Sequence, residues 1–174
     1  MTPELPLTAG GVPLPWIHQA KDRTHTRCLA LHWCWVCGRP LGAHLCFVTD
    51  TAAVFSNAAF HSPMHRDCAE LMQSMQPESE GLTALWTVKK TQGGLKTPRR
   101  FNDGITNNFH CLMGPPVVPP VWQHPDRRPA TRMEVVDALE EHFRAAVTTA
   151  MDEEEIVALD FTLTRALAQF LPAA

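Results

Sequence analysis

The stretch CWVCGRPLG, residues 34–42, predicts a metal-binding turn. Its two cysteines, Cys34 and Cys37, are separated by two residues, a spacing that lets both thiolates face one ion. Gly38 and Gly42 follow, and glycine permits the tight backbone turn that a zinc knuckle requires. A thioredoxin-like redox pair is the alternative, but its cysteines would stand at the start of a helix within a βαβ pattern, and the glycine turn disfavours that arrangement.

The motif HSPMHRDCAELM, residues 61–72, supplies a second pair of ligands. Ser62 is a typical N-cap and Pro63 a typical first helical residue, so we expect a helix to begin there. His65 and Cys68, three positions apart, would then share one face of this helix. The predicted metal ligands are Cys34, Cys37, His65 and Cys68. This closed Cys3His set leaves no open position for water, which is typical of a structural zinc ion, here one per chain.

Four other residues compete for these roles or stand beside them. His61 lies four residues before His65 and could replace one ligand, but it precedes the expected helix and should point elsewhere. Cys28, Cys46 and Cys111 have no partner at ligand spacing, and lone cysteines are usually buried as small apolar residues. We therefore expect them in the core and without disulfides.

Two runs between the ligand pairs, LCFVT (45–49) and AAVFS (52–56), predict short strands. A knuckle, a hairpin and a helix carrying the second ligand pair together describe a treble-clef zinc module. The same scaffold occurs in one class of HNH-like nucleases, whose asparagine and histidine pattern is loosely matched by Asn57, His61 and His65. The predicted hairpin carries no histidine to act as a general base, so nuclease activity ranks third among the functions considered.

The C-terminal part of the sequence predicts two amphipathic helices. Thr131 and Glu134 form a T-x-x-E capping box, which predicts a helix over about 132–149, and Asp152 and Glu155 repeat this signal for a second helix. The apolar residues at helical spacing are Val136, Leu139, Phe143 and Val147 in the first helix, and Ile156, Leu159, Leu163, Leu167 and Phe170 in the second. We expect an antiparallel hairpin that packs on the zinc module through these faces.

The middle of the chain is less regular. LTALWTV (82–88) predicts a strand, and the polar run KKTQGGLKTPRRFNDG (89–104) predicts a loop. In GPPVVPPVW (114–122), proline disfavours a helix or a central strand and favours a stiff, extended connector, packed through Val117, Val118 and Trp122. The proline-rich residues 115–129 could instead be presented to another protein.

Together these signals predict an α+β fold in one compact domain of 174 residues. Its expected parts are an extended N-terminal arm (1–27), a treble-clef-like zinc module (28–76), a strand, loop and proline-rich connector (77–130), and a C-terminal helical hairpin (131–174).

Charge and hydropathy restrict the function classes. The formal net charge of -3 gives no global attraction to nucleic acid, so such binding would need a local patch. The candidate patch consists of Lys89, Lys90, Lys96, Arg99 and Arg100. No apolar run is long enough for a membrane span, and MTPELPLTAGG lacks the layout of a signal peptide, so we expect a cytoplasmic protein.

Several stretches resemble a family of small zinc-motif proteins encoded by tailed bacteriophages and prophages. They are GVPLPW (11–16), CWVCGRPLG with the following FV, HRDCA (65–69), ALW (84–86), VW (121–122) and DRRPATRMEVVDAL (126–139). By this resemblance, the two cysteine-containing motifs supply the family's zinc ligands, and the protein would act in the host cytoplasm. The resemblance implies origin and fold but no activity.

The sequence therefore predicts a non-enzymatic zinc protein that docks on a host or phage protein. The alternative is a nucleic-acid-binding accessory factor that uses the basic residues of 89–101. No small-molecule substrate is indicated.

Overall fold

The computed structural model describes residues 31–59, 61–75, 81–90, 96–102 and 107–172, with the backbone alone over 96–102 and 107–112. Its elements are β1 (His44–Thr49), α2 (Thr51–Ser56), β2 (Ala58–Ala59), α3 (Arg66–Met75), β3 (Thr83–Lys89), β4 (Lys96–Asn102), β5 (Asn107–Leu112), β6 (Val121–Gln123), α4 (Arg132–Thr149) and α5 (Glu153–Gln169). The fold is α+β, as predicted. The expected arm, residues 1–27, and Cys28 lie outside the described residues.

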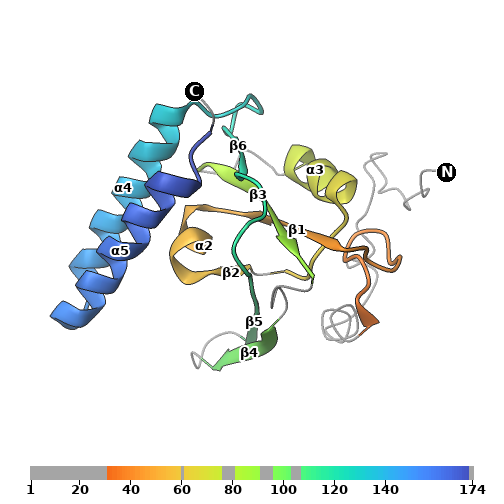
Figure 1. Ribbon diagram of the computed structural model, residues 1–174, viewed down its shortest axis with the longest axis horizontal. Coiled ribbons are helices and arrows are strands. Elements are labelled where there is room, and N and C mark those ends of the chain that lie inside the picture. The colour runs from red at the N-terminus through yellow and green to blue at the C-terminus, as the bar shows by residue number, and fades with distance from the viewer. Residues whose placement is uncertain (1–30, 60, 76–80, 91–95, 103–106, 173–174) are drawn as a thin grey trace.

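The main sheet is antiparallel, with the strand order β1-β3-β6. Its central strand β3 is buried from Thr83 to Val88, which confirms the strand predicted over 82–88. Side chains alternate between the faces of a strand, and the two faces of β3 have different covers. Gln73 of α3 donates to the backbone and hydroxyl oxygens of Thr83, whereas Trp86 packs edge-on against Phe170 at the end of α5. Figure 1 accordingly shows α3 and the α4–α5 pair on opposite sides of this sheet.

The proline-rich segment joins the sheet only at its edge. β6 has three residues and, among the strands of the described part, pairs with β3, as expected for a chain that follows two prolines. Trp122 is buried as predicted, and its indole Nε1 donates to the backbone oxygen of Phe170 at 2.7 Å. Val117 and Val118, which we expected to pack, are exposed instead.

The strand predicted over 52–56 is wrong, because this run forms helix α2. The Asp50 side chain accepts a hydrogen bond from the amide of Ala53, and Asn57 ends the helix in the left-handed conformation at φ 51°. These two caps make a helix from residues whose composition also suits a strand. The antiparallel partner of β1 is therefore β3. On the sequence between α2 and α3, Met64 also forms an isolated antiparallel bridge with Cys46 of β1.

The loop predicted over 89–104 is also wrong in part. β4 begins within it and pairs antiparallel with β5, which in turn pairs with β2 in a second sheet of order β2-β5-β4. A polar run becomes a strand here because it pairs with β5, the next strand in the chain, which itself pairs with the distant strand β2; composition does not reveal either pairing.

The C-terminal helical hairpin is confirmed. α4 spans the predicted residues, and Thr131 and Glu134 form both hydrogen bonds of the capping box. Val135 and Leu139 of α4 and Ala166 and Phe170 of the α5 end enter the hydrophobic core, so the buried stripe of α4 includes Val135 rather than Val136. The other end of the hairpin, where α4 connects to α5, extends away from the two sheets in Figure 1.

Candidate metal centre

The four predicted ligands lie together. One ligand atom from each of Cys34, Cys37, His65 and Cys68 lies within 4.8 Å of all the others. Cys34 and Cys37 come from the turn before β1, His65 directly precedes α3, and Cys68 is in the first turn of α3. The centre therefore joins two segments that are separated by β1, α2 and β2.

The first pair is held by a tight backbone turn. The amide of Gly38 donates to the oxygen of Cys34 at 2.9 Å, and the amide of Cys34 donates to the oxygen of Arg39 at 2.7 Å. Gly38 has φ 67°, a conformation that residues with a Cβ rarely adopt. The glycine turn predicted from the sequence is confirmed, and it places both sulfur atoms on the same side as α3.

Replacing Gly38 with alanine should destabilise the protein by about 1 kcal/mol, because a Cβ strains the left-handed backbone. Gly42 is the matched control, since a Cβ added there meets nothing within 4 Å and its φ is not in that region. Thermal unfolding of the zinc-loaded variants measures the difference. Equal melting temperatures for Gly38→Ala and Gly42→Ala would contradict the role given to this turn.

The helix start predicted at Ser62 and Pro63 is wrong, because α3 begins at Arg66. The backbone of Met64 exchanges two hydrogen bonds with that of Cys46, at 2.8 and 2.9 Å, and this pairing keeps residues 62–64 outside the helix. The oxygen of His65 accepts from the amide of Ala69, so the first helical hydrogen bond still lies next to the ligand pair.

The turn at residues 34–42 orients the ring of His65. Its Nε2 lies 3.0 Å from the backbone oxygen of Pro40, and because a carbonyl oxygen only accepts, Nε2 carries the proton. Nδ1 is then unprotonated, so its lone pair can bind a metal ion, and it lies 3.4 Å from the sulfur of Cys37. Such a hydrogen bond on the far nitrogen is the usual way in which proteins orient a metal-binding histidine. No sequence signal indicated the role of Pro40.

The three thiols interact strongly. The pKa of Cys37 is lowered because its sulfur accepts hydrogen bonds from the thiols of Cys34 and Cys68. The pKa of Cys34 is raised by its hydrogen bond to Cys37, and that of Cys68 by its hydrogen bonds to Cys34 and Cys37. The three thiols are thus coupled through shared hydrogen bonds, and a divalent cation bound by them would displace their protons.

This donor set can hold a metal ion such as zinc. In tetrahedral coordination with zinc–sulfur bonds of about 2.3 Å, neighbouring sulfurs lie about 3.8 Å apart, a separation within the span of the cluster. Cys34 is fully buried, and the other three ligands are half-buried. Soft thiolates with one imidazole suit zinc better than they suit magnesium or calcium, which prefer oxygen ligands.

His61 points away from this centre. Its ring stacks on Trp35, with centroids 5.0 Å apart, and its Nε2 lies 2.6 Å from the backbone oxygen of Val48. Burial lowers its pKa. Asn57, the other residue of the nuclease-like pattern, caps α2, and its backbone oxygen accepts from the amide of Met113. The structure therefore uses both residues in packing and backbone contacts.

The remaining predicted residues are placed as follows. Lys89 and Lys90 are exposed at the end of β3, while Lys96, Arg99 and Arg100 belong to β4, with side chains outside the described part. Cys46 is buried with its sulfur 3.4 Å from the Thr87 hydroxyl, as expected for a core cysteine. The side chain of Cys111 is outside the described part.

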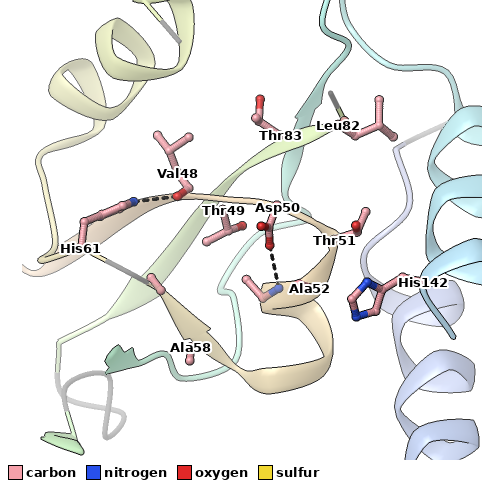
Figure 2. A pocket seen from close by; sticks show the side chains of 13 residues that line it. Val48, Thr49, Asp50, Thr51, Ala52, Ala58, His61, Leu82, Thr83 and His142 are labelled. Carbon is pink, nitrogen blue, oxygen red and sulfur yellow. Dashed lines mark hydrogen bonds between the residues drawn. The ribbon is translucent and has the colours of Figure 1, made fainter. Parts of the chain in front are cut away.

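A pocket that the sequence did not reveal lies between β1, α2 and α4 (Figure 2). It encloses about 520 Å³, and its lining includes Thr49, Asp50, His61 and His142. Asp50 caps α2, His61 is bonded to Val48, and the ring of His142 packs against Phe55 at 4.9 Å. Because these ionisable groups already have local partners, the pocket supports a functional assignment less strongly than the cysteine cluster does.

Compared with models of protein families, with curated proteins and with solved structures, the chain shows no match. The resemblance to phage-encoded zinc-motif proteins therefore stays an expectation from the sequence. Among the described residues, no helix combines the length and the apolar character that crossing a membrane would require.

Proposed function

We propose that this protein is a non-enzymatic, zinc-binding accessory protein of phage type that docks on a host or phage protein in the host cytoplasm. The observation that carries the proposal is the closed Cys3His cluster, whose four ligand atoms lie within 4.8 Å of one another. A zinc ion with four protein ligands has no position for water or substrate, and its role is structural.

One zinc ion per chain would connect the turn at 34–42 to the start of α3. β1 lies between these segments and forms the edge of the main sheet, while α3 covers one sheet face through Gln73 and Thr83. The ion would thereby link the main sheet to α3, the helix that covers one of its faces. A metal in this position contributes directly to folding, because the unfolded chain has no preformed site.

Docking is supported by apolar side chains that the fold leaves in solvent. Val118 on the proline-rich connector and Val157 and Phe161 on α5 are each exposed by 47% or more. Val157 and Phe161 are four residues apart on one helix and therefore neighbours on its surface, and adjacent exposed apolar side chains are typical of protein interaction sites.

The decisive experiment is retention of partners from a bacterial lysate by the tagged, zinc-loaded protein. The lysate is used with and without nuclease and at two salt concentrations, and bound zinc is quantified on the same sample. We expect about one zinc per chain and a protein partner that nuclease treatment does not remove.

Two results would overturn the proposal. If retention disappears with nuclease and weakens steeply as salt rises, the basic residues of 89–101 bind nucleic acid and the alternative function is correct. If the protein as isolated binds no zinc, the metal centre itself is wrong.

A further inference from the structure

The outer surface of α5 carries apolar side chains that do not belong to the core. Val157 and Phe161 are 67% and 69% exposed, and because they are four residues apart they lie side by side on the helix. Met151, just before α5, is 90% exposed. We call Val157 and Phe161, with the acidic residues beside them, the α5 face.

Three carboxylates border these two side chains. Glu153 and Glu154 lie four and three residues before Val157, and Asp160 lies three residues after it, so all three occupy neighbouring positions on the helix surface. The ion pairs found among the described residues include none of them. Asp152 and Glu155, by contrast, are engaged in capping the helix. In the part of the chain that the structure describes, the α5 face is thus an apolar pair bordered by carboxylates that form no ion pair.

The charge of the whole hairpin restricts what can cover this face. Residues 131–174 contain nine acidic residues and three arginines, a formal charge of -6, whereas the whole chain carries -3. Phosphates of nucleic acid and anionic lipid headgroups would be repelled. A second copy of the hairpin would bring like charges together, so the complementary surface is cationic.

We propose that the α5 face binds a basic amphipathic helix of a partner protein, an inference that rests on the proposed docking function and names its surface. A helix lying along α5 would place apolar residues at i, i+3 and i+4 on Val157 and Phe161. Its lysines or arginines would lie next to Glu153, Glu154 and Asp160. Packing of this kind repeats the contact that α4 already makes with the opposite side of α5.

The test uses a synthetic helical peptide as the probe, with leucines at helical spacing and lysines at the remaining positions. Its binding to the full-length, zinc-loaded protein is measured by fluorescence anisotropy. Two control peptides have glutamate in place of lysine, or the same composition in scrambled order. We expect the amphipathic basic peptide to bind at least about tenfold more tightly than either control, and less tightly as salt rises.

Variants locate the binding surface. V157S/F161S and E153K/E154K should each weaken binding at least about tenfold, because they remove the apolar contact and the charge, respectively. E140K/E141K is the matched control, since it makes the same charge change on exposed residues of α4 and should weaken binding less than about threefold. Zinc content and melting temperature of each variant confirm that it is folded.

Three outcomes would overturn the assignment: equal binding of the scrambled peptide, unchanged binding by V157S/F161S, or concentration-dependent dimerisation that V157S/F161S abolishes. The last would show that a second copy covers the face. The two proposals fail separately. If V157S/F161S still retains the lysate partner, this surface is refuted but the docking function stands. If the wild-type protein binds no zinc or retains no protein partner from the lysate, the docking function is refuted.

Discussion

Replacing Cys68 with serine should abolish stoichiometric zinc binding and the cooperative thermal unfolding transition of the module. The free energy of binding of a structural zinc ion is about 10–16 kcal/mol in small zinc modules at neutral pH. Domains of this size are stable by only about 5–15 kcal/mol in total. Loss of one of the four clustered ligands therefore removes a contribution as large as the whole stability.

The matched control is Cys46→Ser, because Cys46 is buried but lies outside the cluster and contacts the hydroxyl of Thr87. It should retain one zinc per chain and unfold cooperatively, with a loss of about 1–3 kcal/mol. Metal analysis and differential scanning calorimetry on both variants measure these effects. A Cys68→Ser protein that melts like the zinc-loaded wild type would show that the ion does not support the fold.

Lowering the pH should weaken zinc binding, as loss of a ligand does. Zinc binding requires three thiolates and a neutral imidazole, so protons compete with the metal at every ligand. Zinc release, followed with a colorimetric chelator, should increase as the pH falls.

Trp86→Ala should have the second largest effect, a loss of about 3–5 kcal/mol of unfolding free energy. Trp86 is fully buried at the centre of the main sheet, where its ring packs on Phe170 with centroids 4.7 Å apart. Its indole nitrogen also donates to the oxygen of Gly114 at 3.1 Å, and the substitution leaves that acceptor without its donor.

Val118→Ala is the comparison, because its side chain is 47% exposed on the proline-rich connector. A surface change of this kind should alter stability by less than about 0.5 kcal/mol. Urea unfolding of the two zinc-loaded proteins distinguishes them. Similar midpoints for both variants would mean that α5 does not stabilise the sheet through Trp86.

The features that the sequence predicted correctly depend on neighbouring residues. Cys34 and Cys37 are close because two residues separate them, and the capping box at Thr131 lies within one helical turn. β3 was visible because its own residues suit a buried strand. The four ligands could be paired because zinc sites combine two such local motifs.

The features that were missed depend on backbone pairing that residue composition does not reveal. Met64 stays out of α3 because Cys46 pairs with its backbone, and β4 is a strand because β5 lies beside it. Cys46 is separated from Met64 by α2 and β2, whereas β5 follows β4 directly, so the β4–β5 hairpin was hidden by its polar composition and not by distance along the chain. α2 is a different case: its caps, Asp50 and Asn57, were local signals, and the apolar run between them hid the helix.

The contact between Trp86 and Phe170 has a consequence for the order in which the chain is made. The ribosome synthesises the metal ligands and the whole main sheet before it reaches the end of α5. Until then, one face of Trp86 has no cover, and Trp122 has no backbone oxygen from Phe170 to bond. During translation, metal capture by the first half of the chain would be what keeps the unfinished sheet folded, so cells short of zinc should accumulate aggregated nascent chains of this protein.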